Sequence, residues 1–156
     1  MRVRLRGVMV GPDLVEHERG WRVPDLGRDD ECMRASFCTV AGVHPIKIPW
    51  IAPGEPNFWR DYEKLANILG YRWEERFGVN EPKESVRRGP WPFADHELWL
   101  AGVGNVGGLA GGNGTPHAIV MRGQKLHYDC LWDHGSGRKR RPTRIGWGIA
   151  MVPADG

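Results

Sequence analysis

The first regular pattern in the chain is a helical repeat of apolar residues that follows a pair of aspartates. One face of this helix would carry Met33, Phe37 and Val40. Their spacings of four and three residues match the helical period. Asp29 or Asp30 is a suitable N-cap, and Gly42 is a suitable C-cap. The pattern predicts a buried helix that begins at about Cys32.

A second helical face begins after Asn57, which we expect to be its N-cap, and ends at Gly70. Its apolar positions are Phe58, Trp59, Tyr62, Leu65, Ala66 and Leu69. Between the two helices, residues 43–51 contain two prolines. Proline disfavours helical conformation both at its own position and at the residue before it, so this segment is predicted to be extended.

The rest of the pattern is short apolar runs separated by turn residues, which is typical of strands. Strands are predicted at 1–10, 71–74, 97–103, 117–121, 125–130 and 145–152, and loops at 11–28, 75–93, 104–114 and 133–142. A turn at Arg122–Gln124 would join two of these strands in a hairpin. Helices followed by antiparallel strands predict an α+β fold.

Length and composition are those of one globular domain. The chain has 156 residues, of which 26% are charged and 40% hydrophobic. It has no internal repeat and no evident domain boundary. We therefore expect residues 1–156 to form a single domain, with an N-terminal strand and loop (1–28), a core (29–130), and a basic loop with a last strand (131–156).

Charge and cysteine content indicate the cellular compartment of the protein but say little about its binding partners. The net charge of +3 is small. Three cysteines at irregular spacing predict no disulfide framework and fit a reducing compartment. No apolar run is long enough to cross a membrane, and residues 1–6 lack the apolar centre of a signal peptide. We expect a cytoplasmic protein that has no membrane partner.

Cys32 has two interpretations, because it stands in the first turn of a predicted helix. There, unpaired N–H groups and the helix dipole favour a thiolate and could hold an oxyanion. The acidic residues just before it, residues 29–31, act against the thiolate. The alternative is a small core cysteine, since free cysteines are often buried. Cys38, about a turn and a half later, is expected in the core.

The predicted hairpin would bring an imidazole and a carboxylate together. His117 opens one strand and Asp129 ends its partner. In that position Asp129 would orient the imidazole and stabilise its charged form, as nucleophilic catalysis by a cysteine such as Cys32 requires. A shift of strand register would replace Asp129 by His127 or Asp133.

Two stretches resemble a group of small papain-like cysteine peptidase homologues from phages and bacteria. The first comprises residues 30–37, Asp-Glu-Cys-Met-Arg-Ala-Ser-Phe, with 43–49, Val-His-Pro-Ile-Lys-Ile-Pro. The second comprises 117–120, His-Ala-Ile-Val, and 127–129, His-Tyr-Asp, which follow a glycine-rich loop. The resemblance covers most of residues 29–130.

This resemblance implies a papain-like α+β fold, with N-terminal helices packed on a small antiparallel sheet. It also implies a triad in which Cys32 is the nucleophile, His117 the base and Asp129 the orienting group. The protein would be a hydrolase or acyltransferase that acts on an amide or isopeptide-type bond of a protein or peptide, without metal or organic cofactor.

The sequence departs from the homologues at two places. They often carry a glutamine before the nucleophile as an oxyanion donor, and residues 24–28 hold none. Backbone N–H groups, Arg28 or a more distant donor would have to take its place. They also tend to have a proline where Cys130 stands. Both departures leave room for an inactive member that binds a host protein or nucleic acid.

Two further alternatives concern ligands. A short basic run consists of Arg138, Lys139, Arg140 and Arg141. It could contact phosphates weakly. In a chain of nearly balanced charge, however, such a run is typical of a solvated loop. A zinc site would draw on Cys32, Cys38, His117 and Cys130. These residues lack the spacing of known zinc motifs, so we expect no metal. The oligomeric state is not predicted.

Overall fold

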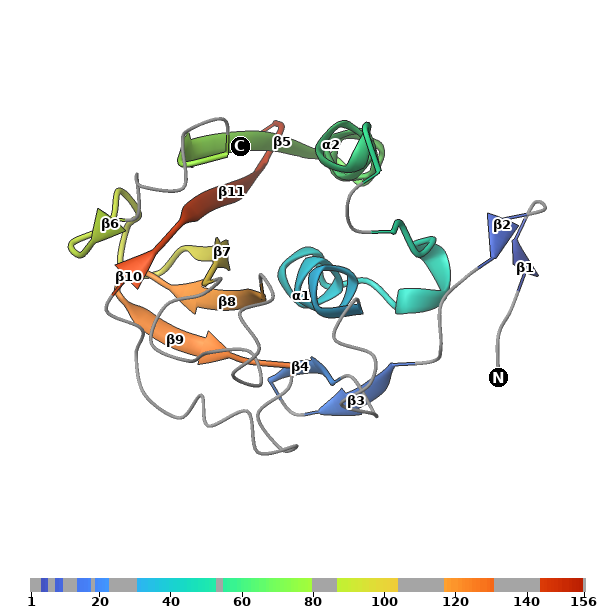
Figure 1. The fold of residues 1–156 in the computed structure, drawn as a ribbon, viewed down its shortest axis with the longest axis horizontal. Coiled ribbons are helices and arrows are strands. Elements are labelled where there is room, and N and C mark those ends of the chain that lie inside the picture. Colours follow the sequence, from blue (N-terminus) through green and yellow to red (C-terminus); the bar gives the residue numbers. More distant parts are fainter. Residues whose placement is uncertain are drawn as a thin grey trace.

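A computed structural model describes residues 4–5, 8–9, 14–17, 19–22, 31–52, 55–79, 87–103, 117–130 and 144–155. Within these ranges the protein is α+β, with two α-helices beside a five-stranded antiparallel sheet (Figure 1). The helices are α1 (Cys32–Ala41) and α2 (Phe58–Ile68), and a 3-10 turn, η2, spans Pro45–Lys47. Neither described α-helix has the length and apolar character that a membrane crossing needs.

The sheet has the strand order β5-β11-β7-β8-β9. Its strands are β5 (Tyr71–Phe77), β7 (Leu98–Gly102), β8 (Ala118–Arg122), β9 (Lys125–Tyr128) and β11 (Trp147–Pro153). The last strand, β11, lies between β5 and β7. β8 and β9 form the predicted hairpin, which turns at Gly123 with a φ of 55°. A side chain at Gly123 would also meet the backbone of Asp95.

Three pairs of short strands lie outside this sheet. They are β1 (Arg4–Leu5) with β2 (Val8–Met9), β3 (Val15–His17) with β4 (Gly20–Arg22), and β6 (Arg87–Arg88) with β10 (Arg144–Ile145). The hairpin β3–β4 docks on α1, because the Trp21 N–H donates to Thr39 Oγ1 at 3.0 Å.

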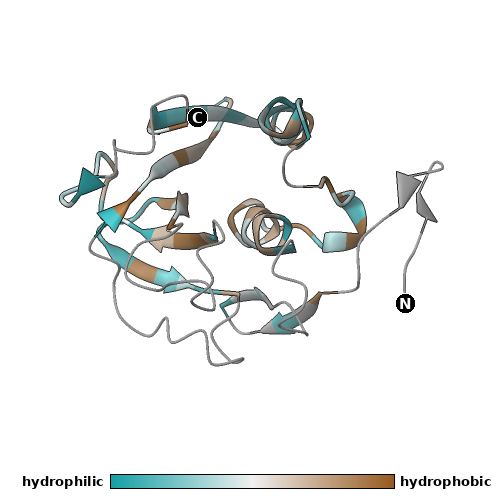
Figure 2. Cartoon of the chain, in the orientation of Figure 1, coloured by the Kyte–Doolittle hydropathy of each residue, from teal (hydrophilic) through white to brown (hydrophobic). Residues whose placement is uncertain are grey.

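Apolar side chains cover both faces of the sheet. On one face α1 is almost wholly buried, and Phe37 packs in a cluster with Leu100, Val120 and Ile149. On the other face Phe93 stacks on Trp99 at 3.8 Å between ring centroids. Figure 2 shows hydrophobic residues concentrated on α1 and β8, whereas β6 is hydrophilic. The sheet is therefore the centre of the core, and α1 is held against it as a buried helix.

Both α-helices begin and end close to the predicted residues. Gly42 is the C-cap of α1, with a φ of 69°, and Asn57 is the N-cap of α2. The predicted aspartate cap of α1 is wrong: the N-cap is Glu31, whose side chain makes no capping bond. Residues 29 and 30 lie outside the described part of the chain.

Four sequence predictions of local structure are wrong. The supposed loop at 11–28 contains the hairpin β3–β4, and the single strand at 1–10 is two short strands. The supposed loop at 75–93 begins with the end of β5, contains β6, and buries Trp91. Pro45 opens a 3-10 turn instead of an extended strand, because a first-turn position needs no N–H from it.

Arg34 ties the first turn of α1 to the segment that contains η2. Its guanidinium donates to the carbonyl oxygens of Ile48 at 2.8 Å and Pro45 at 2.7 Å, and to Glu31 Oε2 at 3.1 Å. Arg34 and Glu31 are both almost completely buried. Removing only one partner of this buried pair is costly, because the charge of the other would remain in a medium of low polarity.

We predict that Arg34→Leu lowers the free energy of unfolding by about 3–5 kcal/mol, because the buried Glu31 charge loses its compensating cation. Urea unfolding followed by circular dichroism measures the loss. Arg72→Leu is the matched control, since the pair Arg72–Glu74 is exposed and such pairs contribute up to about 1 kcal/mol. Equal losses for the two variants would contradict the prediction.

Candidate functional site

Cys32 is the first residue of α1, and its side chain faces the start of β8. The backbone N–H of Ala118 donates a hydrogen bond to Cys32 Sγ at 3.4 Å. The residue is 7% exposed, so the sulfur lies at the margin of the core. As the first residue of a helix, Cys32 also sits beside backbone N–H groups that have no partner within the helix.

His117 and Asp129 lie at the two open ends of the hairpin β8–β9. His117 directly precedes β8, and Asp129 directly follows β9. Because the two strands are antiparallel, these ends meet, and His117 Nε2 lies 2.7 Å from Asp129 Oδ1. Both side chains are buried. The structure thus brings together the imidazole and carboxylate that the sequence singled out.

The two alternatives to Asp129 do not take its place in the described part of the chain. The ring of His127 instead contacts the carbonyl oxygen of Arg19, at 3.2 Å from Nε2. Asp133 lies outside the described residues. The pairing of β8 with β9 shifts register between Val120 and Met121, from Met121 opposite Leu126 to Val120 opposite Tyr128.

The surroundings of His117 favour its charged form. Burial alone would lower its pKa, and this is the largest single influence. Hydrogen bonds to Asp129 and to Cys32, with the negative charge of both groups, act in the opposite direction and together raise the pKa from 6.5 to about 10. His117 is therefore a buried imidazolium with Asp129 and Cys32 as its partners.

The contacts of the ring leave one nitrogen for the sulfur. Nε2 is engaged by Asp129, and Nδ1 has no hydrogen bond of ideal geometry among the described residues. Cys32 is nevertheless close enough to His117 to contribute to its raised pKa. Hydrogen bonds between catalytic groups are often poorly aligned when no substrate is bound. Asp129, His117 and Cys32 thus follow one another as carboxylate, imidazole and thiol.

Ser36 also positions the site, a role that the sequence analysis missed. Its hydroxyl donates to the carbonyl oxygen of Ala118 at 3.2 Å. Together with the bond from the Ala118 N–H to Cys32, this contact ties α1 to the residue next to His117. The signal was available in the sequence: Ser36 is four residues after Cys32, so both lie on the same face of the helix.

Cys130 adds a second sulfur to the cluster, and with His117 and Asp129 it forms a set of potential metal ligands within 4.8 Å of one another. Burial raises the pKa of Cys130 well above its usual value, whereas a metal binds the thiolate. The 2.7 Å separation of His117 and Asp129 is also shorter than the roughly 3.3 Å between two ligands of a tetrahedral metal. The arrangement fits a hydrogen-bonded pair better than a metal centre.

Some sequence-predicted features lie outside the described residues. These are the basic run Arg138, Lys139, Arg140 and Arg141, the glycine-rich loop at 104–114, and the alternative oxyanion donor Arg28. Cys38 is buried in the core as expected, and its burial raises the pKa of its thiol to about 12.

Comparisons of the chain with protein-family models, with curated proteins and with solved structures found no match. The papain-like resemblance therefore stays a prediction, and function has to be inferred from the contacts of the site.

We predict that His117 is still protonated at pH 8 in the folded protein, because Asp129 and Cys32 raise its pKa to about 10. The ring ¹⁵N shifts of a labelled sample report the protonation state directly. His127 is an internal control, since burial lowers its pKa below 6.5 and it should be neutral at the same pH. A neutral His117 at pH 8 would contradict the assignment.

The same shift predicts a pH-dependent stability. Because the folded pKa of His117 is raised, its stabilisation is fully present below pH 6.5 and is lost as the pH rises through about 10. The difference in free energy of unfolding between the wild-type chain and His117→Gln should shrink by up to about 1.4 kcal/mol per pH unit in this window. Urea titrations at pH 6, 8 and 9.5 measure it; a constant difference would refute the linkage.

Proposed function

We propose that the protein is a cysteine-dependent hydrolase or acyltransferase that acts on an amide or isopeptide-type bond of a protein or peptide. The observation that carries this proposal is the buried 2.7 Å contact between His117 and Asp129, beside the thiol of Cys32. A nucleophile, a base and a group that orients the base are the three parts that thiol catalysis needs.

In the first half of the reaction, the Cys32 sulfur attacks the carbonyl carbon of the substrate as a thiolate. The proton of the thiol is held by His117, whose raised pKa makes the imidazolium the stable form. As the tetrahedral intermediate collapses, the C–N bond breaks and His117 gives its proton to the leaving amine. The acyl group remains on Cys32 as a thioester.

In the second half, His117 takes a proton from water, which attacks the thioester. The C–S bond breaks, and the thiol and a carboxylic acid are released. An amine or hydroxyl in place of water would give acyl transfer. Throughout, the bond from His117 Nε2 to Asp129 orients the ring, so that Nδ1 is the nitrogen that exchanges the proton with sulfur.

The N-terminus of α1 is the described feature best suited to hold the oxyanion. Its first N–H groups have no partner within the helix, and the helix dipole favours negative charge there. Glu31 makes no side-chain cap to these groups. They would serve in place of the glutamine that papain-like homologues often carry.

A second candidate function is binding without catalysis on the same scaffold. The burial of Cys32, at 7% exposure, favours it, because a nucleophile must reach its substrate. In this case the protein would bind a host protein or nucleic acid, and the cluster of Cys32, His117 and Asp129 would be structural.

The rate of reaction with iodoacetamide at pH 7.5 separates the two functions. We predict that Cys32 is alkylated at least about tenfold faster than Cys38 and Cys130, since burial keeps the pKa of both other thiols high. His117→Ala should slow the modification of Cys32 by about tenfold or more. Peptide mapping by mass spectrometry assigns the modified residue.

Ser36→Ala is a useful control for this experiment, since it loosens the contact of α1 with Ala118 but leaves thiol and imidazole in place. It should affect the rate much less than His117→Ala. Three thiols of equal, low reactivity in the folded wild-type chain would favour the binding protein and overturn the catalytic proposal.

A further inference from the structure

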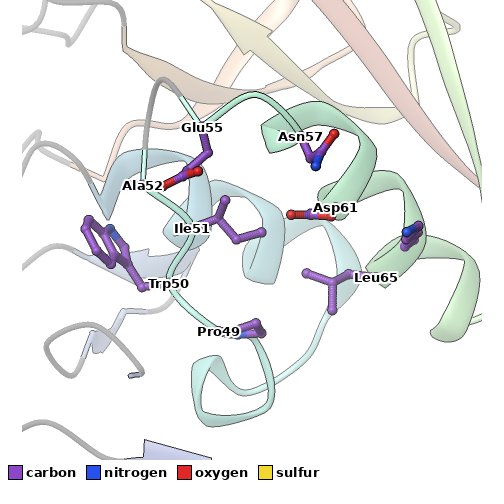
Figure 3. A pocket seen from close by; sticks show the side chains of 9 residues that line it. Pro49, Trp50, Ile51, Ala52, Glu55, Asn57, Asp61 and Leu65 are labelled. Atoms are coloured by element: carbon purple, nitrogen blue, oxygen red, sulfur yellow. The ribbon is translucent and has the colours of Figure 1, made fainter. Parts of the chain in front are cut away.

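A pocket of about 530 Å³ lies between α2 and the segment that follows η2 (Figure 3). It is formed by Pro49, Trp50, Ile51, Ala52, Glu55, Asn57, Asp61, Lys64 and Leu65. Its volume is within the range of small-ligand sites. None of the three residues of the candidate catalytic site lines it, so the pocket is a separate feature of the protein.

The pocket combines an apolar wall with carboxylates. Pro49, Ile51 and Leu65 supply aliphatic surface. Trp50 also belongs to the lining, but its indole is turned away from Asp61 and Leu65 in Figure 3. In Figure 3 the side chain of Asp61 points from α2 toward Ile51, across the pocket. A carboxylate placed beside aliphatic surface is complementary to a cation that has an apolar stem.

The charges of the pocket are not neutralised from within. Glu55 and Asp61 form no ion pair among the described residues. Lys64 is the one cation of the lining, and it too forms no ion pair there. Two carboxylates against one ammonium leave a net charge of −1, in a chain whose overall charge is +3. The negative charge of the pocket is therefore local and runs against that of the whole protein.

Arginine and lysine side chains combine the two properties that complement this pocket, a positive charge and an apolar stem. The methylenes of arginine or lysine pack on apolar surface while the charged end reaches a polar group. A guanidinium or ammonium donates charge-assisted hydrogen bonds to a carboxylate. A free inorganic cation would gain nothing from the aliphatic wall, which covers much of the pocket.

The protein holds this pocket in a defined position relative to α1. Arg34 binds the carbonyl oxygens of Pro45 and Ile48, and Ile48 directly precedes the pocket residue Pro49. The wall formed by residues 49–52 thus starts at a segment that is anchored to the first turn of the buried helix. An anchored wall lowers the entropic cost of binding, since less of the chain must become ordered.

We propose that this pocket binds an arginine or lysine side chain of a polypeptide partner. Asp61 and Glu55 bind the charged end, and Ile51 and Leu65 contact its stem. The site is independent of the chemistry at Cys32: it would select a basic segment of a substrate if the protein is an enzyme, and of a binding partner if it is not.

The test uses the full ¹⁵N-labelled chain and two short peptides, acetyl-Gly-Arg-Gly-amide and its citrulline counterpart. Citrulline has nearly the same shape as arginine but carries no charge. We expect saturable shift changes at Ile51 and at α2 with the arginine peptide only. Raising the salt from 20 to 500 mM should weaken this binding, because partly exposed charges are screened.

Asp61→Asn should weaken binding of the arginine peptide about tenfold, whereas Glu63→Gln should leave it unchanged. Glu63 is the matched control, since it loses the same charge from the same helix but does not line the pocket. If Asp61→Asn does not fold, Glu55→Gln tests the same charge from the other wall.

Three results would overturn the proposal. They are equal shift changes with the citrulline peptide, equal affinity of Asp61→Asn and Glu63→Gln, and the absence of saturable shifts at Ile51 and α2 up to millimolar peptide. Each can occur whether or not Cys32 is reactive, so the fate of this site is separate from that of the catalytic proposal.

Discussion

The contact between His117 and Asp129 is the constraint on which the candidate site depends. Placing an imidazole and a carboxylate in the interior is costly unless each satisfies the other. Their 2.7 Å bond meets that condition only if the ends of β8 and β9 stay together. The pair therefore depends on the hairpin, and the charged state of His117 follows from its contacts with Asp129 and Cys32 rather than from solvent.

The sulfur reaches this pair through the packing of one helix. Ala118 is bonded to α1 through both of its backbone groups, to Cys32 by its N–H and to Ser36 by its carbonyl. Arg34 fixes the same helical turn on the opposite side, through the segment around η2. A rigid helix held from two sides can place a thiol against an imidazole with the accuracy that chemistry at sulfur demands.

The elements that follow from sequence periodicity could be predicted, whereas those that depend on tertiary contacts could not. The apolar repeats gave both α-helices, and Gly42 and Gly70 marked their ends. The spacing of His117 and Asp129 across a short turn indicated their meeting, because a hairpin brings its ends together. The hairpin β3–β4 was missed, since its short strands are stabilised by docking on α1 through Trp21 and Thr39. The bonds of Arg34 were equally hidden, because nothing local marks a basic residue as buried.

The cost of burying polar groups helps to distinguish a structural from a catalytic role for His117 and Asp129. A buried charged pair contributes little net stability, and apolar side chains of the same volume would stabilise a core as well or better. Arg34 and Glu31 have an evident structural role, since their bonds hold the η2 segment to α1. The bond between His117 and Asp129 instead joins the open ends of two strands that already pair with each other. The imidazole beside Cys32 is therefore better explained by proton transfer at sulfur than by stability, and this is why we propose catalysis rather than binding alone.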